Sequence, residues 1–447
     1  MKETDKTING FSRLPKPDKL EWLLENYIPP SDREEVRQQM KSWWHADAGQ
    51  QQLLDGFIEN TVSNFAMPFG VAPNFLVNGR TYAVPMVIEE SSVVAAAASA
   101  AKYWMTRGGF QATVLGMEKL GQVHFSWKGP FAKLQGVFPA LKTALLAEAA
   151  PITANMEQRG GGIRDIVLVD LSDQEPHYYQ LKVTFDTRDS MGANFINSVL
   201  EQFAKTLDSF ISTHPAFEEN DERDVHIIMS ILSNYTPGCV VRASVSCPVA
   251  DLGSFPGGYT AEAMAEKFAK AVRIAHIDPH RAVTHNKGIF NGIDAVILAT
   301  ANDFRAIEAG GHAYAARSGQ YRSLSFCTVT DGIFRFWLDI PLALGTIGGL
   351  TRLHPMARQS LKLMGDPSAE ELMQIIASVG LAQNFAAVRS LVTTGIQQGH
   401  MKMHLANILQ HLGADPVATE QATRHFEGKV VSFTAVRTFL ETLAATT

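Results

Sequence analysis

The stretch YYQLKVTFDTRDSMGANFINSVLEQFAKTLDSFI, residues 178–211, changes from the pattern of a strand to that of a helix. Leu181, Val183 and Phe185 alternate with polar residues, which predicts a half-buried strand. After the turn, apolar residues recur at helical spacing and predict a long helix with one buried stripe, formed by Ile196, Val199, Leu200, Phe203, Leu207, Phe210 and Ile211. The turn therefore lies at a helix N-terminus, where free backbone amides favour a phosphate or a polarised amide. A turn that only starts a helix explains the same pattern.

The pattern continues on both sides and defines a unit of residues 110–235. Further strands are expected over residues 122–127, 166–171 and 225–232, and a further helix over residues 130–150. The resulting order, β-α-β-β-α-β, is that of the ferredoxin-like split βαβ arrangement. The chain has no GxGxxG motif, which disfavours an ordinary Rossmann site for a dinucleotide. RGGGIRD, residues 159–165, is compatible with a phosphate cradle and equally with a tight connection.

The overall composition excludes several classes of protein. The 447 residues are enough for two or three domains. A net charge of -6 gives no reason to expect nucleic acid or an anionic membrane as a partner. The three cysteines are too few and too scattered for a disulfide framework or a zinc site, and we expect no metal. Because the N-terminus is polar and no run reaches about 18 apolar residues, we expect a soluble, cytoplasmic protein.

A second informative stretch is RAVTHNKGIFNGIDAVILATANDFRAIEAG, residues 281–310. Lys287 precedes an apolar run, residues 295–300, that suits a strand or a helix, and Asp303 follows that run. A lysine in such a place can polarise a carbonyl, and a neighbouring carboxylate sets its charge state. A structural ion pair between Lys287 and Asp303 explains the same residues.

Two further motifs carry groups that can transfer protons. VPMVIEESS, residues 84–92, places two adjacent glutamates before an alanine-rich helix, which one of the following serines can cap. Acidic residues stabilise the start of a helix, which explains the glutamates structurally. A glutamate at this position could equally act as a general acid in catalysis. GHMKMH, residues 399–404, places two histidines on one face if the segment is helical. The chain has no HExxH motif and no acidic residue near these histidines in sequence, so they are more commonly surface residues than metal ligands.

Six motifs occur along the chain in the order VPMVIEESSVVAAA, DTRDSMGAN, HNKGIFNGID, ATANDFRAIEAG, GTIGG and GHMKMH. Together they closely resemble the motifs of the 3-hydroxy-3-methylglutaryl-CoA (HMG-CoA) reductases, and their form resembles the soluble class II branch. The resemblance covers the chain from Gly10 to its end. It implies a homodimer, or a higher oligomer, with active sites at the subunit interface.

The fold that the resemblance implies is α+β. A large HMG-CoA-binding and dimerisation domain is expected over residues 1–110 and 236–396. A small ferredoxin-like domain that binds NAD(P) is expected over residues 111–235. Residues 397–447 are expected to form a small helical flap that acts as a lid.

The implied reaction is the reduction of HMG-CoA to mevalonate and coenzyme A, or its reverse, by two hydride transfers from NADPH or NADH through bound mevaldehyde. The resemblance assigns catalysis to Glu90, Lys287, Asp303 and His400. It assigns substrate binding to Ser92, Arg281, Asn291, Asn234, Gln383 and Arg13, the last of these at a CoA phosphate. It assigns cofactor binding to Asp189, Met191, Gly192 and Asn194.

The chemistry of these residue types fits the implied roles. Hydride addition to a thioester builds negative charge on oxygen, which a cationic Lys287 stabilises. Asp303 keeps that lysine protonated. His400 gives a proton to the leaving CoA thiolate, and Glu90 gives one to the aldehyde oxygen in the second reduction.

Two other functions compete with this interpretation: another CoA-thioester enzyme, and a non-catalytic sensor of CoA or a nucleotide. A thiolase needs an activated cysteine, but Cys239, Cys247 and Cys327 have no histidine or lysine motif beside them. A sensor is disfavoured because all four catalytic positions are filled. For the cofactor, Glu157 favours NADH and Arg159 favours NADPH, and of the two we expect NADPH.

Overall fold

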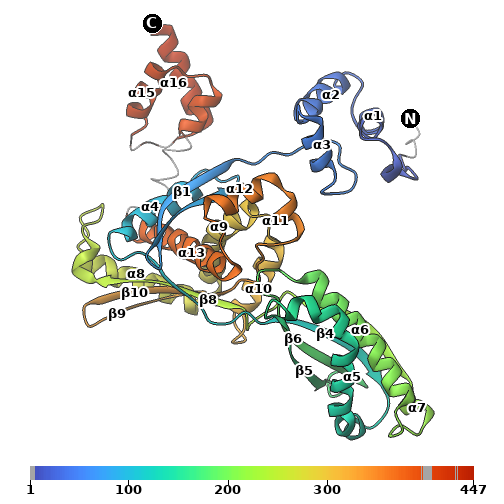
Figure 1. Cartoon of the computed structure of the whole chain (residues 1–447). Coiled ribbons are helices and arrows are strands. Elements are labelled where there is room, and N and C mark those ends of the chain that lie inside the picture. The colour runs from blue at the N-terminus through green and yellow to red at the C-terminus, as the bar shows by residue number, and fades with distance from the viewer. Residues whose placement is uncertain (1–5, 394, 396–404, 428, 430, 447) are drawn as a thin grey trace. The chain divides into compact units, whose positions relative to one another are not determined.

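The structure is a computed structural model that describes residues 6–393, 395, 405–427, 429 and 431–446. The chain forms two compact units, Met1–Pro68 and Phe69–Thr447, each with its own packing (Figure 1). The predicted catalytic residue His400 lies outside the described residues.

The N-terminal unit is helical. It contains η1 (Phe11–Arg13), α1 (Lys16–Tyr27), α2 (Arg33–Ser42) and α3 (Ala48–Asp55). In the described part of this unit, the buried apolar side chains are Leu20 and Leu24. So small an apolar core contributes little free energy, and polar contacts must supplement it.

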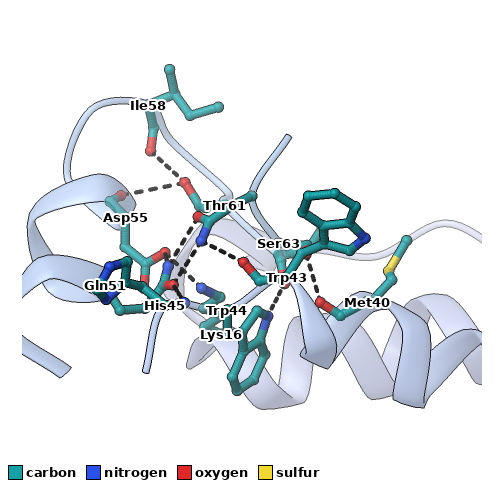
Figure 2. A network of polar contacts seen from close by, with 12 residues as sticks. Lys16, Met40, Trp43, Trp44, His45, Gln51, Asp55, Ile58, Thr61 and Ser63 are labelled. Carbon is teal, nitrogen blue, oxygen red and sulfur yellow. Dashed lines mark hydrogen bonds and ion pairs between the residues drawn. The ribbon is translucent and has the colours of Figure 1, made fainter. Parts of the chain in front are cut away.

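A network of hydrogen bonds supplies those contacts (Figure 2). Asp55, at the end of α3, accepts hydrogen bonds of 2.7 Å from Lys16 Nζ and Gln51 Nε2. The Asn64 amide donates to Gln51 Oε1 at 2.8 Å and to the Trp43 carbonyl at 2.7 Å. These bonds join α1 to α3 and fasten the segment that follows α3 onto α3 and the end of α2.

The second unit begins with a hairpin of β1 (Phe69–Val77) and β2 (Arg80–Val87). Its turn is Asn78-Gly79, with φ of 50° and 82°, as favoured by an Asn-Gly pair. A four-stranded antiparallel sheet follows in the order β3-β8-β10-β9. Its strands are β3 (Gln111–Val114), β8 (Val240–Pro248), β9 (Ser325–Thr330) and β10 (Ile333–Pro341).

Helices pack around this sheet and hairpin (Figure 1). They are α4 (Val93–Met105), η2 (Val249–Leu252), α8 (Ala261–Ile277), α9 (Pro279–Ala299), α10 (Phe304–Ala315), α11 (Gly349–Leu353), α12 (Pro355–Leu363) and α13 (Ala369–Val392). α13 is buried along most of its length and starts with a capping box formed by Ser368 and Glu371. It therefore forms the centre of this core.

Two glycines let α9 and α13 approach closely. A Cβ on Gly292 would lie 2.9 Å from Gln383 Cβ and 3.0 Å from the Val379 carbonyl oxygen. A Cβ on Gly380 would lie 2.8 Å from Ile293 Cγ1. All three distances are shorter than packed atoms tolerate, so the helices can meet this closely only with glycine at both positions.

The smaller part of the second unit has the predicted β-α-β-β-α-β order. Its four strands form an antiparallel sheet in the order β5-β6-β4-β7, with α5 and α6 packed against it (Figure 1). The elements are β4 (Lys119–Trp127), α5 (Phe131–Glu157), β5 (Gly162–Asp170), β6 (Tyr178–Asp186), α6 (Ala193–Thr213), α7 (Asn220–Arg223) and β7 (Val225–Ser233). The ferredoxin-like prediction and the buried stripe of α6 are thus confirmed.

The C-terminal part contains α15 (Pro416–His425) and α16 (Phe433–Thr446). A small apolar cluster of its own joins these helices to the residues just before them: Leu405, Ile408, Leu409, Ala422, Phe426 and Val436. This part is helical, as expected for the flap, whereas its action as a lid stays a prediction.

The apolar run 295–300, for which a strand or a helix was expected, is helical and forms the end of α9 as far as Ala299. One feature differs from the expectations. β3 pairs with β8 of the larger sheet, so the small sheet starts at Lys119 and not at residue 111. Met1–Pro68 form a compact unit of their own. The division into three domains stays a prediction.

Two helices are long and apolar enough to cross a membrane by length and composition, although we expected none. They are α13, whose apolar window is 78% buried inside the protein, and α5, whose window is 22% buried. α13 is a core helix, and α5 packs on α6 and β5. Both helices therefore have packing partners within the chain.

The close approach of α9 and α13 predicts opposite effects for two glycine substitutions. Gly292→Ala should destabilise the protein by about 1–3 kcal/mol, because the new methyl group overlaps Gln383 and Val379. Gly136→Ala on α5, where the added methyl group would meet no atom beyond the backbone of its own helix, should stabilise it by up to about 1 kcal/mol. Thermal unfolding followed by circular dichroism measures both. Equal stability of the Gly292 variant and the unchanged protein would contradict the close packing.

Candidate active site

A cavity of about 830 Å³ lies between the start of α4, the first half of α9 and the second half of α13. This volume suits a small-molecule site. Six residues that the sequence assigned to catalysis or substrate binding line it: Glu90, Ser92, Arg281, Lys287, Asn291 and Gln383. The structure therefore brings together groups that are up to 293 residues apart in the chain.

Helical spacing explains how α9 contributes its three residues. Asp278 caps the helix by accepting a hydrogen bond from the His280 amide, and Pro279 occupies its first turn. Lys287 and Asn291 are one turn apart, and Arg281 lies near the N-terminus. The partial positive charge of that terminus adds to the two cations and favours an anionic ligand.

Lys287 and Glu90 form an ion pair within this cavity. Lys287 Nζ lies 3.1 Å from Glu90 Oε2, and the two side chains are 63% and 34% exposed. Glu89 is exposed, so Glu90 is the glutamate of the pair that faces the cavity. Ser92 is the N-cap residue of α4, but its side chain makes no capping bond. Its hydroxyl thus remains available to a ligand.

Arg281 has no carboxylate partner among the described residues. Burial of its guanidinium lowers the pKa of Arg281, because no nearby anion compensates the lost hydration. A half-buried cation without a counter-ion is stabilised when an anion binds. This residue is therefore the strongest candidate for binding a carboxylate.

His285 was not identified from the sequence, and it lies in the wall of the cavity. It is 2% exposed, and its Nε2 lies 2.7 Å from Ser325 Oγ. Ser325 Oγ donates to Asn384 Oδ1 at 2.8 Å, so the histidine donates to the serine and leaves its Nδ1 as an acceptor. In the described part of the chain, His285 Nδ1 and Gln383 Oε1 are buried without a hydrogen-bond partner. Both atoms can accept a bond from a ligand after a small rearrangement.

Asp303 does not contact Lys287, contrary to our expectation of a Lys287–Asp303 pair. It caps α10 and pairs with Arg305 at 3.0 Å. Burial raises the pKa of Asp303, but the bonds from Arg305 and from the backbone amide of Ala306 outweigh burial and lower it overall. From Lys287 to the end of α9 at Ala299 the helix is about 18 Å long. The two groups therefore lie far apart within one chain.

A second, much smaller cavity, of about 30 Å³, lies between the ferredoxin-like part and α10. Met191 and Asn234 line it together with Ala306, whose backbone amide bonds Asp303. Two residues assigned to the cofactor and the substrate thus lie beside the helix that Asp303 caps. Among the described residues from Phe69 onward, the predicted site residues therefore form two groups, and Arg13 belongs to the N-terminal unit.

The turn before α6 is held from several sides. Gly192 caps α6 with φ of 83°, and a Cβ there would lie 2.4 Å from Thr187 Cγ2. The carboxylate of Asp189 accepts a hydrogen bond of 2.7 Å from the Ala369 amide at the start of α13. Because Gly192 has no side chain to cap α6, the first amides of this 21-residue helix stay available. Asn194 is in that first turn.

Lys119 is a second residue that the sequence did not reveal, since nothing distinguishes it from a surface lysine at a strand start. It is 3% exposed and donates to Thr187 Oγ1, the Ser190 carbonyl and the Leu344 carbonyl. Burial lowers the pKa of Lys119 to about 8. It joins the turn before α6 to the segment after β10.

Comparison with known proteins gives a consistent result. The family described as hydroxymethylglutaryl-coenzyme A reductase matches residues 26–405. A 3-hydroxy-3-methylglutaryl-coenzyme A reductase of Archaeoglobus fulgidus is 35% identical over 91% of this chain and 87% of its own length. A probable reductase of the same name from Borreliella burgdorferi is 32% identical over 91% of this chain and 89% of its own length.

Solved structures agree with the sequence comparison. The 3-hydroxy-3-methylglutaryl-coenzyme A reductase of Streptococcus pneumoniae matches with a TM-score of 0.71 and 35% identity, over 98% of this chain and 100% of that one. The class II enzyme of the same organism, in a structure bound to NADPH in open conformations, matches with a TM-score of 0.70 and 37% identity, over 87% and 100% of the chains.

The fold and these matches define an NAD(P)H-dependent oxidoreductase. The chain belongs to the HMG-CoA reductase family, and within it to class II. Its reaction is the reduction of HMG-CoA to mevalonate and coenzyme A.

The buried His285 predicts a loss of stability in acid. The pKa of His285 is lowered from 6.5 to about 3, mainly by burial. Between pH 6.5 and pH 3, therefore, this histidine is protonated in the unfolded chain but neutral in the folded protein. Stability is therefore lost as the pH falls below 6.5, by about 2 kcal/mol at pH 5. His285→Gln should reduce this loss. Unfolding in urea at pH 7.5 and pH 5 measures it. An equal loss in both proteins would show that other groups cause the acid sensitivity.

Proposed function

We propose that the cavity between α4, α9 and α13 binds the HMG group, and that a second copy of the chain completes the active site. The observation that carries the first proposal is the half-buried guanidinium of Arg281, which faces the Lys287–Glu90 pair across one cavity. In this proposal Arg281 binds the free carboxylate of HMG. Ser92, Asn291 and Gln383 then hold the hydroxyl and the remaining polar atoms.

Lys287 is positioned to stabilise charge on the thioester oxygen. Hydride addition makes that oxygen negative, and a fixed cation beside it lowers the barrier most when water is excluded. The side chain of Lys287 is 63% exposed in one chain, so substrate and further protein must cover it before reaction. Glu90 accepts a hydrogen bond of 3.1 Å from the lysine as a carboxylate, so it first takes up a proton from solvent and then donates that proton to the aldehyde oxygen in the second reduction.

The residues at the start of α6 fit a dinucleotide. The backbone amides that Gly192 leaves uncapped favour the pyrophosphate, and Asp189, Met191 and Asn194 are its neighbours in the chain. When bound, NADPH or NADH supplies the hydride. The turn is fixed by Lys119 and by the bond from Ala369 to Asp189, which pre-organises the amides before binding.

A second chain supplies the groups that one chain keeps apart. About 18 Å of α9 separates Lys287 from the end of the helix next to Asp303. In the proposed homodimer, Asp303 and the cofactor turn of one protomer meet the Lys287 cavity of its partner. Asp303 then keeps Lys287 protonated, His400 gives a proton to the CoA thiolate, and Arg13 meets a CoA phosphate. We place this dimer, soluble and without metal, in the cytoplasm.

The alternative thiolase-like chemistry has less support. Burial raises the pKa of Cys239 to about 11 and also raises the pKa of Cys247 and Cys327, which opposes formation of a nucleophilic thiolate. A non-catalytic sensor would not need the Lys287–Glu90 pair in its binding cavity. Purified protein with HMG-CoA and NADPH or NADH tests all three functions, because only the reductase oxidises the nicotinamide.

Substitution of Lys287 tests the proposed cavity. Lys287→Ala should lower kcat by about a hundredfold to a thousandfold or more, because a single stabilising donor is lost from the oxyanion. HMG-CoA should still bind, since Arg281 remains. Nicotinamide absorbance and calorimetric titration with HMG-CoA measure the two effects. Lys270→Ala, at an exposed lysine of α8, serves as the control and should keep full activity. Retained turnover in the Lys287 variant would refute its role.

Mixed dimers test whether the active site is shared between chains. Lys287→Ala and Asp303→Ala proteins should each be inactive, whereas their co-expression should restore about a quarter of the activity, because half of the dimers then hold one intact site. Lys287→Ala mixed with Glu90→Gln should restore nothing, since these two groups share one cavity. If the Lys287→Ala and Asp303→Ala proteins form mixed dimers but recover no activity, the whole active site lies within one chain.

A further inference from the structure

Two carboxyl groups meet where α9 packs against α10. The side chain of Asp294 on α9 is hydrogen-bonded to that of Glu308 on α10. In the described part of the chain, Asp294 Oδ1 is buried without a hydrogen-bond donor from another group, and neither residue forms an ion pair. An ionised carboxylate can only accept hydrogen bonds, so a bond between two carboxyl groups requires a proton on one of them. This helix contact therefore contains a proton.

The proton resides on Asp294 at neutral pH. Burial, and after it the negative charge of Glu308, raise the pKa of Asp294 to about 8. Although α9 also packs against β2, α4, α8, α12 and α13, Glu308 is the charged group among the described residues that acts on Asp294. On α9 itself, Lys287 lies about 10 Å away along the helix. Beyond Glu308 lies Tyr321, whose hydroxyl is 2.7 Å from His312 Nδ1.

Glycines let α10 pack closely on its neighbours. A Cβ on Gly311 would lie 2.4 Å from Phe290 Cζ of α9, and a Cβ on Gly310 would lie 2.7 Å from the Asn234 carbonyl oxygen. Contacts as close as these depend on small shifts between the two helices. If the shared proton is lost, two negative charges face each other at this contact, and their repulsion pushes α10 away from α9.

The position of Asp303 follows that of α10. Its carboxylate accepts hydrogen bonds of 3.0 and 3.2 Å from the backbone amides of Arg305 and Ala306, and it pairs with the Arg305 side chain. Asp303 and Glu308 are about 7.5 Å apart along this one helix. A displacement of α10 therefore moves the Asp303 carboxylate by a similar amount.

We propose that Asp294 is a positioning residue: the proton that it shares with Glu308 keeps α10 packed on α9 and thereby holds Asp303 in place for the reduction. The proposal rests on the proposed function of Asp303, which is to meet Lys287 of a second protomer. Asp294 follows Lys287 by seven residues and Asn291 by three, so all three lie along one side of α9. That side of the helix thus carries both cavity residues and the contact with α10.

The pH dependence of kcat tests the proposal. In the unchanged protein, kcat should fall about tenfold between pH 7 and pH 9, because Asp294 ionises near pH 8. Asp294→Asn should keep the kcat of the unchanged protein at pH 7 and should not show this fall, because its amide donates to Glu308 and cannot ionise. Glu266→Gln, at an exposed position of α8, is the control and should have the pH profile of the unchanged protein.

Removal of the hydrogen bond provides a second kinetic measurement. Asp294→Ala should lower kcat at pH 7 about tenfold to a hundredfold, as a misplacement of about 1 Å does. The KM for HMG-CoA should stay the same, since the residues of the HMG cavity are unchanged. A normal kcat in this variant would overturn the proposal. Retention of the alkaline fall by Asp294→Asn would overturn it as well.

Unfolding in urea tests for the proton itself, without turnover. The unfolded chain releases this proton near pH 3.8 and the folded protein near pH 8, so a rise from pH 5.5 to pH 8 favours unfolding. Over this range the urea midpoint of the unchanged protein should fall relative to that of Asp294→Asn. Equal changes in the two proteins would overturn the proposal. Absence of turnover in the unchanged protein would instead reject the proposed function, and unfolding would still decide whether the carboxyl pair holds a proton.

Discussion

The close contact between α9 and α13 is the constraint on which the substrate cavity depends. Gly292 and Gly380 remove the side chains that would hold these helices apart. As a result, Gln383 on α13 faces the same cavity as Arg281, Lys287 and Asn291 on α9. Both helices are long and internally hydrogen-bonded, so they fix the positions of these side chains more precisely than loops would. The segment just before α4 then adds Glu90 and Ser92 from the third side.

Much of the fold could be predicted from sequence, because its signals are local. The alternation around Leu181 and the helical stripe from Ile196 to Ile211 each report one element, and the ferredoxin-like order follows from their succession. The Asn78-Gly79 turn is equally local. By contrast, the pairing of β3 with β8 joins residues more than 120 positions apart, and nothing in the sequence of β3 specifies that partner.

The candidate site divides in the same way. Motifs identified Glu90, Arg281 and Lys287 by residue type, and the structure places them in one cavity. Proximity in sequence suggested that Lys287 pairs with Asp303. The rigid helix α9 lies between the two residues, however, and Lys287 pairs with Glu90 instead. His285 and Lys119 were missed because their roles depend on burial and on bonds to distant segments. A single sequence carries no direct signal for either property.

The bond between Asp189 and the Ala369 amide has a consequence for the distance between the two substrates. It fixes the cofactor turn to the first residue of α13, while Gln383 faces the substrate cavity fourteen residues later. α13 therefore acts as a ruler of about 21 Å between the two places. Hydride transfer requires the reacting atoms to approach to about 3–3.5 Å. A helix cannot shorten, so in the proposed homodimer the surface of the second protomer brings the two reactants together. In the proposed homodimer, α13 thus holds the cofactor turn and the HMG cavity of one protomer apart, and the partner completes each of them.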